Sequence, residues 1–326
     1  MTTAKLRDLK SLGDVARACG VERDFIEAYA ASQDQKSYYR ALKLPKRGKR
    51  RKGEYRVVFD AREQRLAAFH RSMSMIVTNS TVFGDHVQGF LKRRSTRTNA
   101  ERHLGAKVLL HADIKGFFDA ICTKRVVDAF IADGSKVQLA NLLAKACTID
   151  GRLRQGTRCS PTIANLVCHG MDQAFLRLAR SKDCVYTRYA DDITFSGQDV
   201  PDDEAVREIL ESHEFKLRDD RCFRQYRGRC QFVTGLTVAD QSRPRLPKRL
   251  KRQLRLTMYY IKKHGLDEHF SGVDFGEQIR QEAWLSGMLK YARSIEPQLV
   301  KEWQEIFNDA LANREPYDPD PDRDDY

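Results

Sequence analysis

The spacing of hydrophobic and polar positions divides the chain into helical and extended stretches. In residues 1–39 apolar side chains recur at roughly helical spacing and Gly20 supplies a stop signal, so this region is predicted to be helical. Tyr55–Phe59 predicts a strand, and residues 61–77 predict a helix. The mostly apolar run Ala106–Asp113 predicts a buried strand that carries its acid at the carboxyl end.

Residues 184–196 predict two strands that meet at a tight turn, because their flanks are rich in β-branched and aromatic residues. Asp191 and Asp192 are adjacent in that turn. Neighbouring carboxylates repel each other and weaken a hairpin. A divalent cation such as Mg²⁺, which prefers hard oxygen ligands, offsets that cost. A solvated Asp-Asp turn without metal is the alternative for the dipeptide alone.

Asp113 supplies a second acidic position. Metal-assisted phosphoryl transfer uses two cations about 3.5–4 Å apart, held by carboxylates that converge from separate elements. Asp113 together with Asp191 and Asp192 satisfies that requirement if the two strand regions meet. The alternative is that Asp113 merely ends a strand, and spacing alone does not decide between the two.

The C-terminal quarter of the chain is predicted to be helical and then disordered. Residues 246–263 carry an apolar stripe with cations on the other faces, which is typical of an amphipathic helix, and 284–291 predict another helix. The stripe consists of Leu246, Leu250, Leu254, Met258 and Ile261. The tail after Arg314 has three prolines and many aspartates and is predicted to be disordered.

Charge points to a polyanionic partner. A length of 326 residues suits about two domains, and 41% hydrophobic residues suffice for a real core. The net charge of +13 is typical of nucleic-acid binders, although a charged surface also serves solubility. Residues 40–52 hold eight cations and no acid, and residues 243–263 hold nine and no acid. Such blocks favour interaction surfaces over plain solvation.

The eight cysteines indicate reduced thiols. They contain no Cys-x-x-Cys pair, which argues against a zinc site, and a chain with a full core does not need a disulfide framework. The N-terminus lacks an apolar signal region, and no run of 18 apolar residues occurs. We therefore expect a cytoplasmic protein with no membrane partner.

The motifs, taken in order, resemble those of a reverse transcriptase. They are Asp113 followed by a Phe-Phe pair, Gln155-Gly156 with Ser160-Pro161 and Asn165, and Tyr-Ala-Asp-Asp at 189–192. Two more elements are similar to those of bacterial retron reverse transcriptases. They are Asn-Ala-Glu-Arg-His at 99–103 and Val-Thr-Gly at 233–235. The resemblance runs from about residue 40 to about residue 295.

The resemblance implies an α+β fold, namely a right-hand polymerase with fingers, palm and thumb. The implied division is 1–50 for an N-terminal helical region and basic loop, 51–240 for fingers and palm, 241–314 for a thumb, and 315–326 for an acidic disordered tail.

The resemblance also implies the chemistry of the site. Asp113, Asp191 and Asp192 would be catalytic and would hold two Mg²⁺ ions, with the backbone carbonyl of Ile114 completing one shell. The reaction would be RNA-templated DNA synthesis from deoxynucleoside triphosphates. A non-catalytic RNA-binding scaffold is the alternative from another class, and the intact aspartates argue against it.

Four residues are implied to contact the incoming nucleotide: Arg56, Phe118, Gln155 and Gly156. Phe118 would exclude a ribonucleotide 2′-OH. The alternative is that Phe118 packs in the core, as most phenylalanines do, and Phe117 is expected to have that core role. Gly156 would permit close backbone approach. For Arg56, backbone-phosphate contact or plain solvation is the alternative.

The sequence departs from the family pattern in three places, at four residues. Arg154 stands where proline usually precedes Gln-Gly, and Arg158-Cys159 replaces the usual pair before Ser-Pro. Arg221 occupies a position that usually holds lysine, and an arginine there would act by charge alone. Loop shape and nucleotide affinity are the properties that these changes put in question.

The remaining candidate residues are expected to bind RNA. Asn99 and His103 are four apart and would share a helix face, as a structural pair, a metal half-site or an RNA contact. With no further His or Cys nearby, the structural and RNA-contact interpretations are favoured. The other candidates are Val233, Thr234, Gly235, Lys248, Arg249, Arg252 and Arg255.

Retron resemblance implies particular partners. Retron enzymes use a structured noncoding RNA as template, prime from the 2′-OH of a guanosine and make a branched RNA–DNA hybrid called msDNA. They typically act with a separate effector protein in anti-phage defence. A reverse transcriptase of the group II intron or diversity-generating type is the alternative within the class. Intron enzymes usually carry maturase and endonuclease segments, which this sequence does not show.

Overall fold

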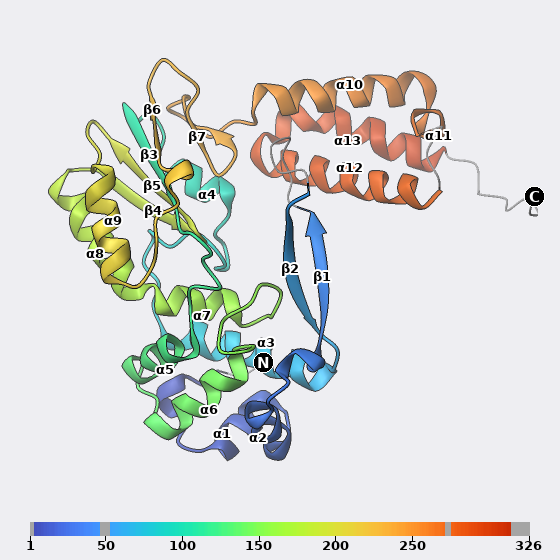
Figure 1. Ribbon diagram of the computed structural model, residues 1–326. Helices are drawn as coiled ribbons and strands as arrows, with labels where there is room; N and C mark the ends of the chain where they lie inside the picture. Colours follow the sequence, from blue (N-terminus) through green and yellow to red (C-terminus); the bar gives the residue numbers. More distant parts are fainter. Residues whose placement is uncertain (1–2, 46–52, 271–274, 314–326) are drawn as a thin grey trace, which may run out of the picture.

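The computed structural model describes residues 3–45, 53–270 and 275–313. Figure 1 shows a helical base, a mixed sheet-and-helix region above it, a bundle of long helices to one side, and a two-stranded ribbon between base and bundle. The mixture of helices and sheets agrees with the predicted α+β class. Within the described residues, no helix is long and apolar enough to cross a membrane.

A four-stranded antiparallel sheet forms the centre of the mixed region, in the order β4-β5-β3-β6. Its strands are β3 (Val108–Asp113), β4 (Val185–Tyr189), β5 (Asp192–Gly197) and β6 (Phe223–Tyr226). Both the predicted buried strand and the predicted hairpin are confirmed. Strand alternation sends Leu110 and its i±2 neighbours to one face and Leu109 to the other.

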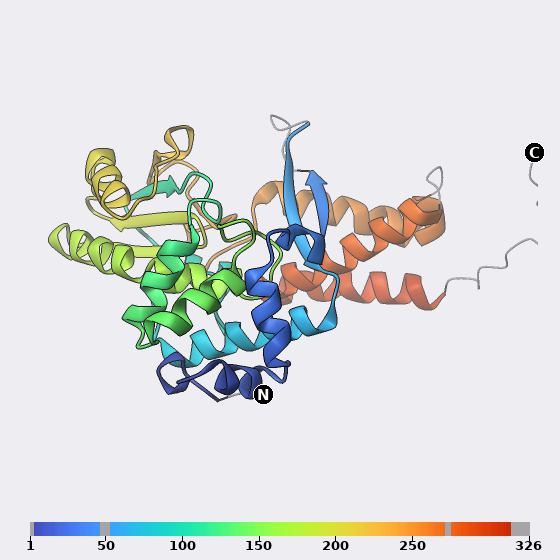
Figure 2. The same cartoon turned by 60° about the horizontal axis from the view of Figure 1, so that its bottom comes forward.

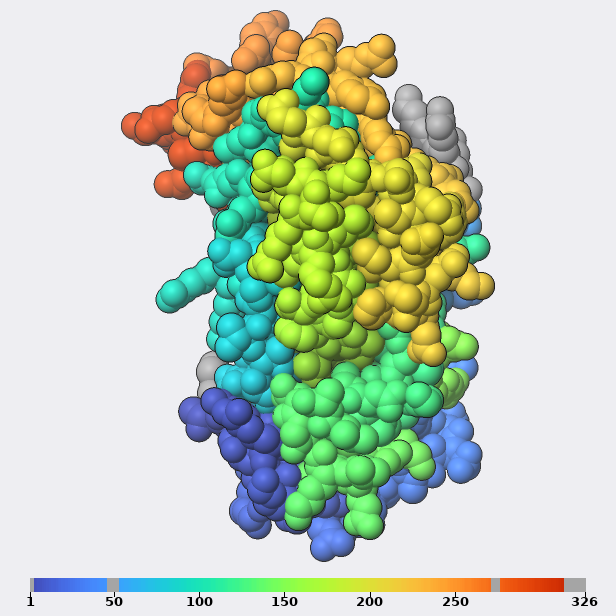
Figure 3. Space-filling view, turned by 90° about the vertical axis from the view of Figure 1, so that its left-hand side faces the viewer, coloured from blue at the N-terminus to red at the C-terminus, as the bar shows by residue number. Residues whose placement is uncertain are grey.

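Helices cover the Leu110 face of the sheet. Phe175 of α8 (His169–Ser181) meets Phe195 of β5 edge to face at 5.7 Å, and α9 (Asp203–Ser212) adds Val206 and Leu210 to the same core. Figure 3 shows the outer side of α8 and α9, which form a continuous surface above the base.

The helical base contains helices that come before and after β3 in the sequence. Its helices are α3 (Gln64–Ser80), α5 (Thr123–Ala132), α6 (Val137–Cys147) and α7 (Ser160–Val167). The predicted helix at 61–77 corresponds to α3, shifted by three residues at each end. These helices share one hydrophobic core with the sheet, so the sheet is anchored on a rigid support.

The N-terminal region is helical, as predicted, and packs on the base (Figure 2). Its elements are η1 (Leu6–Asp8), α1 (Leu12–Cys19), α2 (Arg23–Ala31) and η2 (Gln35–Tyr38). Ser11 and Asp14 form a capping box at the start of α1, and Gly20 ends that helix in the left-handed conformation with φ of 63°. The stop signal in the sequence therefore marks a real helix end.

The two-stranded ribbon consists of β1 (Tyr39–Pro45) and β2 (Tyr55–Ala61), paired antiparallel. The strand predicted at 55–59 is thus confirmed and is two residues longer. Most of the predicted basic loop, residues 46–52, lies outside the described residues.

The C-terminal part contains a short hairpin and a helical bundle. The hairpin pairs β7 (Phe232–Val233) with β8 (Leu236–Thr237), and α4 (Thr96–Glu101) packs against it. The bundle contains α10 (Lys248–His264), α11 (Leu266–His269), α12 (Phe275–Ile295) and α13 (Pro297–Ala312). The helix predicted at 246–263 is α10, which begins after Pro247, and the helix predicted at 284–291 lies inside the longer α12. The acidic tail at 315–326 lies outside the described residues.

A second hydrophobic core joins the bundle to the sheet. It includes Leu254, Met258 and Ile261 of the predicted α10 stripe, together with Leu236 of the short hairpin and Leu109 of β3. Strand β3 therefore contributes one face to each core. This arrangement fixes the position of the acid at its carboxyl end.

Candidate active site

Three aspartates meet where β3 ends and β5 begins. Asp113 is the last residue of β3 and lies directly opposite Asp192, the first residue of β5. The amide of Ile114 donates to the backbone carbonyl of Asp191 at 3.0 Å, which holds the third acid to the same corner. Side chains directly opposite each other in an antiparallel pair have Cβ atoms about 4.5–5.5 Å apart. The convergence that the sequence required is therefore present.

The turn between β4 and β5 is tight and strained. Tyr189 pairs with Asp192, so only Ala190 and Asp191 form the loop. Ala190 has φ of 59°, in the left-handed region that non-glycine residues seldom adopt. Two-residue hairpins need such positive φ values. The strain at Ala190 is the cost of presenting two consecutive aspartates at the strand end.

The carboxylates oppose each other's ionisation. Partial burial, followed by the charges of Asp191 and Asp113, raises the pKa of Asp192 to about 7, against the smaller lowering effect of Arg221. By its accessible surface, however, Asp192 is an exposed residue, so solvent screens much of this effect. Burial also raises the pKa of Asp191, and Arg218 partly opposes that shift.

The donor set suits a hard divalent cation. The three side chains offer carboxylate oxygens, the ligands that Mg²⁺ prefers. Across residues 3–45, 53–270 and 275–313, however, no group of three or more His, Cys, Asp or Glu side chains already forms a metal-binding cluster. The three carboxylates therefore suit a divalent cation in two ways: their oxygens are its preferred ligands, and its charge would offset their mutual repulsion. Metal binding would draw the carboxylates together. The contribution of the Ile114 carbonyl stays a prediction.

A buried ion pair lies beneath the turn. Arg188 and Asp172 are 0% and 1% exposed, and they form two hydrogen bonds, Nε–Oδ1 at 2.8 Å and Nη2–Oδ2 at 2.7 Å. The Arg188 Nη1 donates to Asn165 Oδ1 at 3.0 Å and to the carbonyl of Ala190 at 3.1 Å. The hydroxyl of Tyr186 donates to Asp172 Oδ1 at 2.7 Å. The guanidinium thus connects α7 and α8 to the backbone of the aspartate turn.

Sequence reasoning missed this pair. Asp172 lies in α8, at a position with no motif, and only the fold brings it to the arginine. A signal was present in the strand that precedes the turn, because an arginine in the interior of a predicted buried strand requires a buried partner. The sequence places Asn165 in a motif without assigning it a role, and in the structure its side-chain oxygen accepts a hydrogen bond from Arg188.

The segment before α4 also supports the turn. The amide of Gln88 donates to the carbonyl of Arg188 at 2.7 Å, and the amide of Arg188 donates to the carbonyl of His86 at 2.8 Å. Asn165 Nδ2 donates to the carbonyl of Gly89 at 3.0 Å. A Cβ on Gly89 would lie 2.5 Å from the backbone nitrogen of Ala190. Only glycine allows the two backbones to approach this closely.

The Gln155-Gly156 loop packs against the ribbon. The amide of Phe59 donates to the carbonyl of Gln155 at 2.8 Å. Gly156 has φ of 106°, and a Cβ there would lie 2.6 Å from the carbonyl oxygen of Phe59. Strand β2 therefore fills the space that a side chain at Gly156 would need, and close approach of a nucleotide to this residue stays a prediction. The exposed side chains of Gln155 and, on β2, Arg56 remain available to a ligand, and nucleotide contact by this loop stays a prediction.

The two unusual arginines of the loop differ in environment. Arg154 Nη1 donates to Asp119 Oδ1 at 2.7 Å, so it fastens the loop to the segment that follows Asp113. Arg158 is exposed and the adjacent Cys159 is buried. Arg154 therefore makes an ion pair at the position where the resemblance implies a proline.

The two phenylalanines after Asp113 differ as expected. Phe117 is 4% exposed and stacks on Phe215 with ring centroids 6.0 Å apart, which is the core role. Phe118 is half-buried and touches Phe117 and Phe90 at its edges. Its remaining exposed surface leaves it free to meet a ligand.

The structure corrects the RNA-contact interpretation of three residues. Asn99, His103 and Val233 are each 1% exposed. Helix α4 ends at Glu101, so His103 lies beyond it, and its ring nitrogens bond to hydroxyls of Ser196 and Thr187, both at 2.7 Å. Burial lowers the pKa of His103 to about 3. Both ring nitrogens are engaged by these hydroxyls, so His103 has a structural role and is not positioned to bind a metal ion or RNA.

Other RNA candidates remain at the surface. Thr234 donates from Oγ1 to the carbonyl of Thr96 at 2.9 Å, and Gly235 is exposed with φ of 82°. A pocket of about 190 Å³ brings these two residues together with Asp113, Asp192 and Arg221. The four remaining candidates, here termed the α10 cations, are exposed and do not line this pocket. They are Lys248, Arg249, Arg252 and Arg255.

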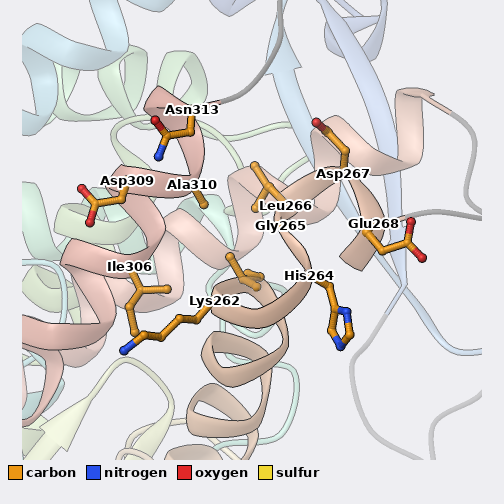
Figure 4. Close-up of a pocket in the computed structure, with 11 residues that line it drawn as sticks. Lys262, His264, Gly265, Leu266, Asp267, Glu268, Ile306, Asp309, Ala310 and Asn313 are labelled. Carbon is orange, nitrogen blue, oxygen red and sulfur yellow. The ribbon is translucent and has the colours of Figure 1, made fainter.

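A hollow of about 370 Å³ lies at the opposite end of α10, between α11 and α13. Figure 4 shows its lining, where His264, Asp267 and Glu268 lie on one side and Asp309 and Asn313 on the other. None of the predicted site residues lines it. The predicted catalytic residues Asp113 and Asp192 line the pocket at the ends of β3 and β5, and not this hollow.

Comparison with known proteins gives a consistent result. Residues 44–227 match the family described as "Reverse transcriptase (RNA-dependent DNA polymerase)". The chain is 32% identical over 272 residues to the retron Mx65 reverse transcriptase of Myxococcus xanthus, covering 74% of this chain and 62% of that protein. It is 28% identical over 330 residues to the retron Mx162 reverse transcriptase of the same organism, covering 90% and 65%. The chain thus spans less than two thirds of either relative.

Among solved structures, telomerase from Candida albicans in complex with a TWJ fragment of telomeric RNA is 10% identical to this chain, with a TM-score of 0.48. That match covers 85% of this chain and 55% of the telomerase chain.

Proposed function

This chain belongs to the reverse transcriptase family, with bacterial retron enzymes among its relatives, and we propose that it is an RNA-directed DNA polymerase. The observation that carries the proposal is the corner at which Asp113 faces Asp192 across neighbouring strands, with Asp191 in the adjoining turn. A pocket lies against two of these carboxylates, so a substrate can reach them.

In the proposed reaction, a terminal hydroxyl attacks the α-phosphate of a deoxynucleoside triphosphate, a phosphodiester bond forms, and pyrophosphate leaves. Two bound Mg²⁺ ions would neutralise charge on the attacking and leaving oxygens. Asp113 and Asp191 would be the principal ligands, with Asp192 and the Ile114 carbonyl assisting. Arg218 lies 3.9 Å from Asp113 and Arg221 lines the pocket, so both add positive charge near the phosphates.

We assign the regions of a right-hand polymerase on the same basis. Residues 51–240 would form fingers and palm, with the four-stranded sheet as the palm, and residues 241–314 would form the thumb. Residues 1–50 would be an N-terminal extension and 315–326 an acidic tail. The two hydrophobic cores support a division between sheet and bundle, because the bundle packs mainly within its own core.

Three exposed or half-buried side chains would select the nucleotide. Gln155 and Arg56 are exposed on the loop and ribbon, and these two elements are joined by the Phe59 amide. Phe118 would lie beneath the sugar and exclude a 2′-OH. Gly156 would serve by keeping the loop close to β2.

The relatives support a retron role. We propose that the template is a structured noncoding RNA, that a guanosine 2′-OH serves as primer, and that the product is msDNA. A separate effector protein would complete an anti-phage system. Eight free cysteines suit a reducing compartment, and we propose the cytoplasm as the site of action. The α10 cations would hold the RNA backbone, and Thr234 and Gly235 would contact it near the carboxylates.

To test the retron role, the chain is expressed together with its native upstream locus, and total nucleic acid is separated on a denaturing gel. The expected result is a small DNA species that shortens after RNase treatment and is absent with Asp191→Asn. Glu208→Gln, which changes an exposed carboxylate on α9, is the matched control and should leave the species unchanged. The retron assignment fails if no branched species forms although the purified chain extends a DNA primer on RNA.

A further inference from the structure

The Arg188 side chain is fully buried, yet all three nitrogens of its guanidinium group donate hydrogen bonds. Two of them are used by Asp172 in a bidentate ion pair, and the third is shared between Asn165 and the carbonyl of Ala190. A buried ion pair is seldom the most stable way to fill a core, because desolvation offsets much of the attraction. The pair therefore calls for a reason other than stability.

That reason lies at the Ala190 carbonyl. Ala190 holds an unfavourable left-handed conformation immediately before the two aspartates. A strained residue persists only where its surroundings fix it. The Arg188 hydrogen bond fixes the carbonyl that leads into the Asp191 peptide, and Gly89 packs against the Ala190 nitrogen.

The anchors of Arg188 come from two different helices. Asn165 lies in α7 and Asp172 lies in α8, and both are essentially inaccessible to solvent. Asn165 also binds the Gly89 carbonyl, so one amide side chain ties the arginine and the neighbouring segment together. The turn is thus held from α7, from α8 and from residues 86–89 at once.

We infer that Arg188, held by Asp172 and Asn165, is a positioning residue that orients the Asp191 and Asp192 carboxylates for metal binding. The inference rests on the proposed function only for its effect on polymerisation. The predicted effect on metal affinity depends only on Asp113, Asp191 and Asp192 binding a metal ion, and not on the reaction that the chain catalyses.

The test compares Arg188→Lys with Arg125→Lys in the full-length chain. Lysine keeps the charge opposite Asp172 but cannot hold Asp172, Asn165 and Ala190 together with planar geometry. Arg125 is the matched control because it too is a largely buried arginine that donates to backbone carbonyls, those of Ala120, His213 and Glu214. Mn²⁺ binding is measured by electron paramagnetic resonance on the protein without nucleic acid, at a temperature where unfolding curves show each variant folded.

We expect Arg188→Lys to weaken Mn²⁺ binding about 10-fold or more, as loss of a group that orients metal ligands does. It should lower kcat for primer extension about 10- to 100-fold, with little change in the KM for template-primer. Arg125→Lys should leave both properties as in the unsubstituted chain. Asn165→Ala, which keeps the Arg188–Asp172 pair, should shift Mn²⁺ affinity in the same direction by a smaller factor.

Equal Mn²⁺ affinity in folded Arg188→Lys and in the unsubstituted chain would overturn the inference. Equal weakening by Arg125→Lys would also overturn it, because the effect would then follow from any buried arginine. Absence of primer extension by the unsubstituted chain, with Mn²⁺ affinity still lowered by Arg188→Lys, would count against the polymerase proposal and leave the positioning inference standing.

Discussion

Replacing Asp192 with asparagine is expected to raise the free energy of unfolding at neutral pH while removing a carboxylate that the proposed reaction needs. Partial burial and the charges of Asp191 and Asp113 raise the pKa of Asp192 to about 7 in the folded chain, from an ordinary value of 3.8. The folded state therefore disfavours ionised Asp192. An uncharged amide of similar size removes that penalty.

The sign of the pH dependence follows from proton linkage. The folded chain binds the Asp192 proton more tightly than the unfolded chain does, so this group stabilises the fold fully below about pH 4. That stabilisation is lost as pH rises through about 7. Each unit of pKa difference corresponds to about 1.4 kcal/mol in a shielded site. Because Asp192 is exposed to solvent, we expect a gain of only about 1 kcal/mol from Asp192→Asn at pH values above 7.

The assay is urea unfolding in chelator at a series of pH values, with Glu208→Gln as the control for loss of an exposed carboxylate. The difference between Asp192→Asn and the unsubstituted chain should be near zero below about pH 4, grow as pH rises from about 4 to about 7, and keep its full value at about pH 8.5. Adding Mg²⁺ should stabilise the unsubstituted chain more than the variant, because ligand binding to the folded state adds stability.

Two results would refute this reasoning. One is a variant that is less stable than the unsubstituted chain at about pH 8.5. The other is a stability difference that does not change with pH, which would mean that electrostatic repulsion at the corner is not its cause.

Three other substitutions test separate parts of the account. Phe118→Ala should raise kcat/KM for ribonucleotides relative to deoxyribonucleotides about 10-fold, measured by single-nucleotide incorporation, and an unchanged ratio would reject the sugar-exclusion role. Gly156→Ala should cost about 1–3 kcal/mol in urea unfolding, because its Cβ would lie 2.6 Å from the Phe59 carbonyl at a φ of 106°, and a neutral effect would contradict the close approach. Replacing Arg249 and Arg252 by glutamine should reduce the slope of log affinity against log salt for RNA by about 0.7 for each cation, and an unchanged slope would remove α10 from the RNA interface.

Local patterns were sufficient to predict the elements that carry the chemistry. The apolar run before Asp113 and the β-branched flanks of the Asp-Asp turn each form a strand, because their side chains suit a buried sheet. The α10 stripe likewise predicts its buried face, since helical spacing brings Leu254, Met258 and Ile261 to one side.

Contacts between distant elements were not predictable from local patterns. The spacing of Asn99 and His103 suggested a shared helix face, but α4 ends at Glu101 and tertiary burial decides the role of both residues. The partner of Arg188 lies on another helix, and no periodicity in the sequence connects it to Asp172. Gly156 was predicted to let a nucleotide approach the backbone closely, and only the fold shows that β2 lies against this residue.

The most direct test of the central claim is primer extension by the purified chain on a defined RNA template with deoxynucleoside triphosphates and Mg²⁺. We predict template-length DNA from the unsubstituted chain, and none from Asp113→Asn, which should bind the same RNA with unchanged affinity by fluorescence anisotropy. A folded, RNA-bound chain that makes no DNA, or an Asp113→Asn variant that extends the primer equally well, would contradict the account.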